Sequence, residues 1–368
     1  MILPDRVRER AERLTEALPA YVYDLAALDR HAAAVRRALG DTELYYAVKA
    51  NPDPALLRTL APYADGFEVS SIGEVRHLRS VLPDARLALG GPGKTDAELA
   101  LDVHRVHVES PGELRRLIGM DAPADVLLRV NLAVPVEGAS LAMGGGATPF
   151  GMDPAGVREC LGLLPASTRV RLRGVHAHLA SGLRAPELLG LAETVLAFAR
   201  ELAAGEVDVG GGMAVSYHEP ERLFDWETYG RGLARLRAPG ETLRVEPGRA
   251  LTAYCGWYLT RVIDVKRVHG EVFAVVTGGT HHLRTPAAKG HDQPLAVLPT
   301  GRAGTGTTGE PVTVVGQLCT PKDVFAREIP LSVNVGDIVA FGLAGAYAWT
   351  ISHHDFLMHP RPGFHYLT

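Results

Sequence analysis

A lysine stands at the end of an apolar run near the start of the chain. In the stretch YYAVKANPDPALLRTL, which covers residues 45–60, Lys49 follows Val48, and Asn51-Pro52 interrupts the run. A lysine at the end of a buried strand usually has a partner. Lys49 could extend its amine to water. If it is desolvated near another cation, it could instead lose its proton and attack an aldehyde as a Schiff-base lysine.

Two other motifs suit a phosphate group. A triple glycine occupies residues 210–212 in VDVGGGMA, and the stretch EPGR covers residues 246–249. Glycine lets backbone N–H groups approach an anion closely, and the planar guanidinium of Arg249 matches a phosphate. A triple glycine alone is more typical of a flexible turn. With Arg249 at the end of the next predicted strand, the phosphate interpretation is favoured.

Glu246 also has two interpretations. It could form a surface ion pair with Arg249 or Arg244, which would contribute little to stability. If the phosphate belongs to pyridoxal phosphate, Glu246 could pair with the pyridine nitrogen and keep the ring protonated, which makes the ring a strong electron sink. An amine for the aldehyde, a cradle for the phosphate and a carboxylate for the ring nitrogen then form one coherent set.

Two residues of the C-terminal third add to this set. Cys319 lies in a predicted loop, VGQLCTPKDVF, although a cysteine is often only a small buried hydrophobic residue. Tyr347 follows two small residues in the motif GAY, where its hydroxyl could donate to a phosphate oxygen. It could equally be an ordinary half-buried tyrosine.

The elements that would position these residues follow a strand–helix rhythm. Apolar runs predict strands at 44–48, 66–69, 86–89, 105–108, 126–130, 171–178, 207–209 and 243–246, with helical segments such as 28–39 and 188–204. This rhythm predicts an α/β fold, a (β/α)8 TIM-type barrel of parallel strands, with a doubly wound open sheet as the alternative. In such a barrel the chemistry belongs at the C-terminal strand ends, where Lys49, the triple glycine and EPGR fall.

Beyond residue 250 the pattern changes. Short β-type runs separated by Gly, Pro and Asp predict a mainly antiparallel C-terminal β domain. We therefore expect a cofactor-binding barrel over residues 20–250 and a β-rich domain over 251–368, which residues 1–19 could join.

The composition is that of an ordinary globular protein. The chain has 368 residues, 46% of them hydrophobic and 22% charged, with a net charge of −4, so no basic excess predicts binding to nucleic acid. No apolar run reaches the length of about 18 residues that a membrane span needs. The N-terminal residues lack a signal pattern, and three cysteines cannot form a disulfide framework, so a cytoplasmic location is expected.

Seven ordered motifs carry a resemblance to a known family. The stretches YYAVKAN, FEVSSIGEV, GVHAHLASG, VDVGGGMA, VEPGRALTA, GQLCTPKD and GAYAW occur in this order over nearly the whole chain. The set resembles the fold-type III pyridoxal phosphate decarboxylases, the ornithine and diaminopimelate decarboxylase family with an alanine-racemase-like barrel. The resemblance implies a homodimer with active sites shared between subunits.

The resemblance also implies roles for individual residues. Lys49 would be the Schiff-base lysine, His178 the imidazole that stacks on the cofactor ring, and Glu246 the partner of the pyridinium. His176 is expected inside the barrel. The remaining cofactor ligands would be Ser181, Gly211, Gly212, Gly248, Arg249 and Tyr347. Cys319 would cross the dimer interface and reprotonate the carbanion after carbon dioxide leaves. Racemases of similar fold place an arginine at the ring nitrogen, so Glu246 favours decarboxylation.

One departure from the family pattern concerns the substrate. The residue after the cysteine is usually acidic and contacts the distal amine of the substrate, but here it is Thr320. With the Arg- and His-containing loops, this resembles a subgroup from siderophore and antibiotic pathways, whose amino acid is attached to citrate or to a carrier protein. Substrate contacts are then expected from Thr320, Arg284, His281, His282 and His353.

Several alternatives stay open. A free diamino acid such as diaminopimelate or ornithine could be the substrate, or the protein could be a racemase or an inactive regulatory homologue. A small pyridoxal phosphate-binding homeostasis protein would lack the β domain. A metal site is not expected, since the histidine pairs are adjacent and side chains of adjacent strand residues point to opposite faces.

Overall fold

The computed structural model describes residues 1–14, 18–134, 138–284, 290–301 and 305–368. By its contacts the chain forms two compact units. The barrel unit contains Arg30–Ala214 and Phe224–Ala250, and the β unit contains Met1–Asp29, Val215–Leu223 and Leu251–Thr368. The division into two domains at residue 250 stays a prediction about the organisation of the chain.

The barrel unit is built on a closed eight-stranded barrel, as the strand–helix rhythm predicts. All neighbouring strands in it are parallel. In barrel order the strands are β10 (Glu206–Asp208), β11 (Thr242–Val245), β2 (Glu43–Ala47), β3 (Gly66–Val69), β4 (Leu87–Leu89), β5 (Arg105–Val108), β6 (Ala124–Arg129) and β8 (Val170–His176). Two short strands, β7 (Leu141–Ala142) and β9 (Ala180–Ser181), pair with each other.

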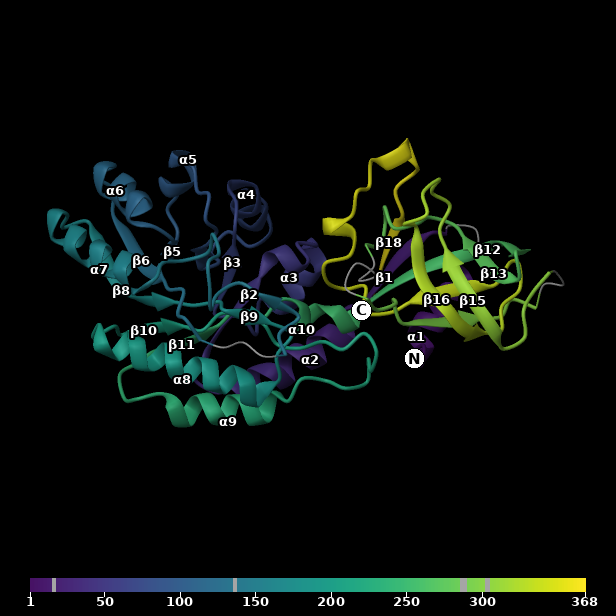
Figure 1. Cartoon of the computed structure of the whole chain (residues 1–368), viewed down its shortest axis with the longest axis horizontal. Helices are drawn as coiled ribbons and strands as arrows, with labels where there is room; N and C mark the ends of the chain where they lie inside the picture. The colour runs from purple at the N-terminus through teal and green to yellow at the C-terminus, as the bar shows by residue number, and fades with distance from the viewer. Residues whose placement is uncertain (15–17, 135–137, 285–289, 302–304) are drawn as a thin grey trace. The chain divides into compact units, whose positions relative to one another are not determined.

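Helices surround the barrel strands (Figure 1). They are α2 (Leu25–Leu39), α3 (Pro54–Leu60), α4 (Ile72–Val81), α5 (Asp96–Leu99), α6 (Pro111–Gly119), α7 (Pro154–Leu163), α8 (Ala185–Glu201), α9 (Trp226–Leu236) and α10 (Arg249–Thr252). Several of their starts are fixed locally by capping side chains. At α6, for example, the Ser110 hydroxyl accepts the backbone N–H of Glu113 at 3.0 Å.

A charged layer fills the N-terminal part of the barrel interior. The Arg244 side chain is 2% exposed, lies over the ring of Tyr45 at 4.4 Å, and pairs with Glu43 at 2.5 Å and Glu206 at 3.4 Å. A buried guanidinium is tolerated only when it is paired in this way. Burial is the first influence on Arg244 and would lower its pKa, but the acidic side chains around it outweigh burial and raise the pKa, which keeps the group charged.

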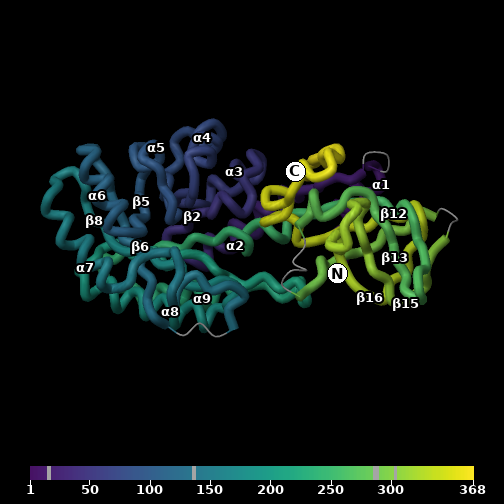
Figure 2. The backbone as a smooth tube through the Cα atoms, turned by 45° about the horizontal axis from the view of Figure 1, so that its top comes forward, coloured from purple at the N-terminus to yellow at the C-terminus, as the bar shows by residue number. Residues whose placement is uncertain are grey.

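The β unit is mainly antiparallel, as expected for the C-terminal segment. Its sheet follows the order β14 (Leu295–Leu298), β17 (Ile338–Phe341), β12 (Gly256–Val268), β13 (Glu271–Val276), β15 (Glu310–Val315) and β16 (Val324–Leu331). Strand β1 (Ala20–Asp24) pairs with β12 and with β18 (Gly363–Leu367). The backbone trace shows β12, β13, β15 and β16 running together in this unit (Figure 2).

The N-terminal helix α1 (Asp5–Arg13) belongs to the core of the β unit. Its buried face, Val7 and Ala11, packs in one cluster with Trp257 and Ile338. No helix among the described residues is long and apolar enough to cross a membrane.

Candidate active site

Lys49 lies in a single 3-10 turn, Val48–Ala50, directly after β2. Its amine donates to Glu68 Oε2 at 2.6 Å, and the side chains are 45% and 5% exposed respectively. Glu68 also accepts the Ser70 hydroxyl at 2.9 Å, so its carboxylate is held in place. The structure thus anchors the tip of Lys49 on a buried carboxylate while the side chain remains open to a ligand.

The triple glycine forms a tight turn after β10. A Cβ at Gly211 would lie 2.4 Å from the carbonyl oxygen of Glu246, and a Cβ at Gly212 would lie 2.2 Å from that of Ala180. Gly212 also has φ +98°, which side-chain-bearing residues rarely adopt. Glycine is therefore required here for close backbone approach. The turn is closely packed against the neighbouring backbone.

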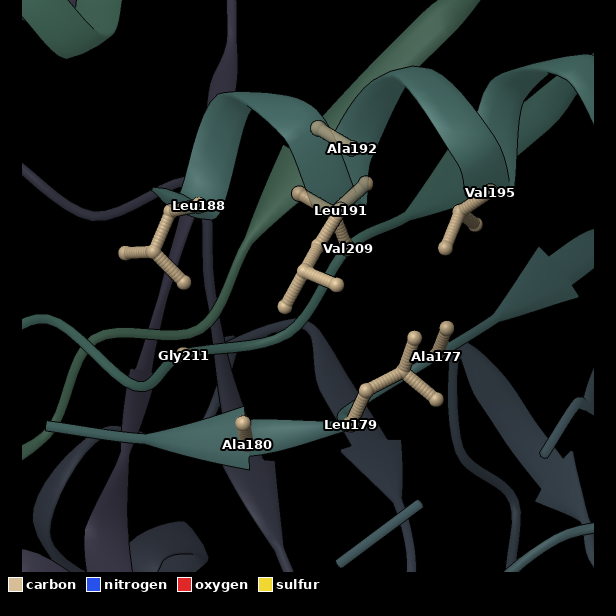
Figure 3. A pocket seen from close by; sticks show the side chains of 9 residues that line it. All are labelled: Ala177, Leu179, Ala180, Leu188, Leu191, Ala192, Val195, Val209 and Gly211. Carbon is tan, nitrogen blue, oxygen red and sulfur yellow. The ribbon is translucent and has the colours of Figure 1, made fainter. Parts of the chain in front are cut away.

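Helix α8 supports this turn from outside. Leu188, Leu191, Ala192 and Val195 of α8 face the strand segments that carry Leu179, Val209 and Gly211 (Figure 3). All residues lining the narrow gap between them are apolar or glycine. Because such a gap offers no polar side chain to a ligand, we interpret it as packing that fixes the position of the turn.

His178 is oriented by the same turn. Its Nδ1 accepts the backbone N–H of Gly211 at 3.0 Å, so the ring proton lies on Nε2, 3.5 Å from the Ser181 hydroxyl. Burial, with the charge of Lys49 second, holds the pKa of His178 well below its ordinary value of 6.5. A neutral imidazole in a fixed orientation is suited to stacking on an aromatic ring.

Glu246 follows β11 and points into the barrel. His176 Nε2 donates to its Oε2 at 3.1 Å, while Oε1 is buried and has no hydrogen-bond partner among the described residues. Burial raises the pKa of Glu246 to about 7; Glu68 adds to this rise and Lys49 opposes it. Oε1 lies 3.9 Å from His107 Nε2 and can still accept a hydrogen bond. Neither ion pair suggested for Glu246 from the sequence, with Arg249 or Arg244, is among those formed by the described residues.

Three further polar side chains lie close to Glu246. The ring of His107 stacks on that of His176 at 4.0 Å, and one ligand atom from each of His107, His176, Asp208 and Glu246 lies within 4.8 Å of the others. The rings are inclined by only 15°. The lone pairs of two stacked rings lie in nearly parallel planes and cannot converge on one ion, so the geometry of this set does not suit a metal ion.

The remaining predicted cofactor residue of the β unit is Tyr347. Its backbone has φ +49°, in the left-handed region that is unusual for a residue with a large side chain. Two residues earlier, a Cβ at Gly345 would lie 1.8 Å from the carbonyl oxygen of Thr252. The small residues of the GAY motif therefore allow the segment to approach the backbone near Thr252.

Cys319 lies on an exposed loop after β15. The buried carboxylate of Asp323 organises this loop, because it accepts the backbone N–H groups of Leu318 at 2.8 Å and Thr280 at 2.6 Å. Thr320 follows the cysteine, and its backbone N–H is bonded to the Leu318 carbonyl at 2.9 Å. The thiol is thus presented at the tip of a turn that is anchored from below.

The predicted substrate residues differ in their surroundings. Arg284 and His353 are exposed. His282 is buried, and both of its ring nitrogens are used by the protein, with Tyr258 Oη at 2.9 Å and the Pro360 carbonyl at 2.9 Å. His281 is also buried, and neither ring nitrogen has a hydrogen-bond partner among the described residues.

Comparison with protein families identifies the family to which the chain belongs. Residues 25–253 match the pyridoxal-binding domain of the pyridoxal-dependent decarboxylases. The chain is a member of this family. It is therefore a pyridoxal phosphate-dependent amino-acid decarboxylase, as the resemblance of its motifs implies.

Named relatives cover most of this decarboxylase. It is 38% identical to the 2-[(L-alanin-3-ylcarbamoyl)methyl]-2-hydroxybutanedioate decarboxylase of Staphylococcus aureus, over 95% of this chain and 94% of the relative. It is 34% identical to the diaminopimelate decarboxylase of Deinococcus radiodurans, over 94% and 88%. The solved diaminopimelate decarboxylase of Helicobacter pylori, in complex with L-lysine, superposes with a TM-score of 0.88 at 24% identity, over 98% and 94% of the chains.

The barrel unit of the decarboxylase fits its cofactor. The glycine turn lets backbone segments come too close together for any Cβ, and Glu246 presents an oxygen without a hydrogen-bond partner among the described residues. We expect Lys49 to hold the aldehyde carbon and Glu246 the ring nitrogen. The assignment of Ser181, Gly211, Gly212 and Arg249 to the phosphate, of Gly248 to the cofactor, and of Tyr347 of the β unit to the phosphate, stays a prediction.

Four residues of the site were missed from the sequence. Glu68, His107, Asp208 and Asp323 are buried and hold, or lie beside, groups that the motifs identified. Three of them stand inside quoted motifs: Glu68 in FEVSSIGEV, Asp208 in VDVGGGMA and Asp323 in GQLCTPKD. A carboxylate within an otherwise apolar strand is a usable signal, since it is rarely buried without a function or a partner.

Proposed function

We propose that this decarboxylase acts on an amino-acid centre within a conjugated substrate, specifically a citrate-linked intermediate of the kind used in siderophore biosynthesis. The observation that carries this proposal is the 38% identity, over 95% of the chain, to a relative whose name describes a citrate amide of a diamino acid. Thr320 supports it, because a hydroxyl after Cys319 offers no counter-ion to a cationic distal group.

The chain's own groups would divide the work as follows. Bound pyridoxal phosphate supplies an electron sink for the pair released when the Cα–carboxylate bond breaks. Lys49 would hold the cofactor at its aldehyde carbon, and Glu68 would keep the lysine side chain in position. His178 limits the space on one ring face, and Glu246 holds the proton at the ring nitrogen. Cys319 would deliver a proton to Cα, and its exposed position at a loop tip suits this step.

The citryl group of such a substrate carries two carboxylates and a hydroxyl. We propose that Arg284 and His353 meet these anions, because both side chains are exposed and Arg binds carboxylates in a bidentate manner. His282 is not part of this proposal, since its ring nitrogens are already bonded within the protein.

A substrate panel tests the proposal. We expect carbon dioxide release from a citrate-linked diamino acid, with kcat near the usual enzyme value of about 10 s⁻¹, and release from free diaminopimelate or ornithine at least roughly 10²-fold slower in kcat/KM. The blank is the Lys49→Ala protein. Comparable turnover of a free diamino acid would contradict the proposal and place the enzyme with the diaminopimelate decarboxylases it also resembles.

A carrier-tethered substrate is the second candidate. The chain is 26% identical, over 94% of its length, to an L-glutamyl acyl-carrier-protein decarboxylase of Niallia circulans. If neither free nor citrate-linked amino acids are turned over while the cofactor is bound, this candidate replaces the first.

We further propose a cytoplasmic homodimer with shared active sites. No disulfide joins Cys160, Cys255 and Cys319 in the described part of the chain, which suits a reducing compartment. A closed dimer would let Cys319 of one subunit complete the site of the other, as the family resemblance implies.

Subunit mixing tests this arrangement. We expect the Lys49→Ala and Cys319→Ala proteins to be nearly inactive separately. After denaturation and refolding together they should recover roughly a quarter of wild-type activity, since half of the dimers would then contain one intact site. A mixture as inactive as its parents would show that each subunit holds a complete site. Each protein refolded alone is the control.

A further inference from the structure

The cluster of His107, His176, Asp208 and Glu246 contains a second buried carboxyl group, that of Asp208, which the proposed mechanism does not use. We infer that Asp208 keeps a proton when Glu246 is ionised, and donates it to Glu246 as a hydrogen bond. Asp208 is then a positioning residue that keeps Glu246 anionic and aimed at the cofactor ring nitrogen. The effect of Asp208 on the cofactor rests on the proposed role of Glu246. The shared proton itself does not, because it is expected in the cofactor-free protein as well.

The geometry of Asp208 leaves one oxygen for this bond. Oδ1 accepts the backbone N–H of Gly210 at 2.9 Å. Oδ2 is buried without a hydrogen-bond partner among the described residues, with Arg244 Nη1 at 3.8 Å as its ion-pair neighbour. Asp208 and Glu246 lie within the same 4.8 Å cluster. Two carboxylates this close, and this far from water, cannot both be ionised cheaply.

Other charged and titratable groups also face this pair. They are Lys49 and Tyr45 at β2, Glu68 on β3, Lys94 before α5, His107 on β5, Arg129 on β6, His176 on β8, Tyr229 on α9 and Arg244 on β11. Burial holds the pKa values of His107 and His176 well below 6.5, so both rings are neutral. Arg244 is the cation nearest to Asp208, yet it is already paired with Glu43 and Glu206.

Geometry places the proton on Asp208 and not on Glu246, and the directions of the two pKa shifts agree with it. Asp208 is 0% exposed and depends on a 3.8 Å ion pair, whereas Glu246 accepts a 3.1 Å bond from His176. Burial, and then the charge of Glu246, raise the pKa of Asp208 well above 3.8, while burial brings that of Glu246 to about 7. The pair therefore shares one proton, and Asp208 holds it.

The same side chain couples two parts of the cofactor site. Through Oδ1 it fixes the start of the glycine turn, and through the donated proton it orients Glu246. Asparagine has the same shape, can accept from Gly210, and always carries a donor. Asp208→Asn therefore resembles protonated Asp208 at every pH. Asp208→Ala removes both the hydrogen bond from Gly210 and the one donated to Glu246.

Infrared spectroscopy of the cofactor-free protein tests the inference without any activity. At about pH 8, a unit above the pKa of Glu246, we expect a carbonyl-stretch band of a protonated carboxyl group in wild type. The band should vanish in Asp208→Asn and persist, shifted, in Glu246→Gln. Asp153→Asn is the matched control, because Asp153 also accepts a backbone N–H, from Gly156 at 2.9 Å, but is exposed.

Denaturation against pH gives a second readout. A carboxyl group whose folded-state pKa is raised stabilises the fold below its unfolded pKa and loses this contribution as pH rises. Wild type should therefore lose stability relative to Asp208→Asn between about pH 4 and pH 8. Absence of the band in wild type, or its persistence in Asp208→Asn, would overturn the inference. If the band behaves as expected and Glu246→Gln keeps full activity, only the proposed role of Glu246 fails.

Discussion

Replacing Lys49 with alanine is expected to lower kcat by roughly 10³-fold or more, because the chain then has no amine at the end of β2 to capture the cofactor aldehyde. The variant also removes the cation that lies 2.6 Å from Glu68, a carboxylate that is 5% exposed. We therefore expect a modest loss of stability beside the loss of activity. Carbon dioxide release and the absorption spectrum of the bound cofactor measure the first effect, and chemical denaturation the second.

Two variants separate the amine from its charge. Lys49→Arg keeps a cation beside Glu68 but cannot act as a nucleophile, because its guanidinium stays protonated. It should recover stability and remain inactive. Lys266→Ala, at an exposed lysine of β12, should change neither property. An active Lys49→Arg enzyme would show that Lys49 is needed for its charge alone.

The barrel strands could be predicted from the sequence because each is a short apolar run between turn residues. The predicted strand at 66–69 has the bounds of β3, and the run at 207–209 differs from β10 by one residue at each end. Parallel strands are covered on both faces, so their sequences carry few polar interruptions. The strand Ala20–Asp24 was not predicted, since its partners β12 and β18 are more than 200 residues away along the chain.

The site was predictable where one residue type carries the chemistry. Lys49, Glu246 and the glycines stand in motifs whose combination is typical of a cofactor site and is hard to explain by structural roles alone. Asp323 could not be recognised in this way, because its role is to accept backbone N–H groups from Leu318 and Thr280, which only the folded loop brings to it. Supporting carboxylates of this kind depend on tertiary contacts, and their sequence signal is a single ordinary acid.

Replacing Glu246 with glutamine should change activity and stability in opposite directions. The glutamine side chain would still accept from His176 and would fill the same volume, but it carries no charge with which to hold a proton at the ring nitrogen. We expect kcat to fall roughly 10²- to 10³-fold, the usual loss when one preorganised electrostatic group is removed. Initial-rate measurements with saturating cofactor test this part.

The stability of the cofactor-free protein should rise at the same time. Burial raises the pKa of Glu246 from 4.5 to about 7, so ionising it in the fold costs about 3 kcal/mol more than in the unfolded chain. Linkage gives the direction of the pH dependence: the proton on Glu246 stabilises the fold of wild type below pH 4.5, and this contribution disappears by about pH 7. Glu246→Gln should therefore be more stable than wild type at about pH 8 and nearly equal at about pH 4. Glu201→Gln, at an exposed glutamate, should show neither effect. If the protein becomes more stable when Glu246 loses its charge, the charge is kept for catalysis. A loss of stability of Glu246→Gln at about pH 8 would mean instead that Glu246 stabilises the fold.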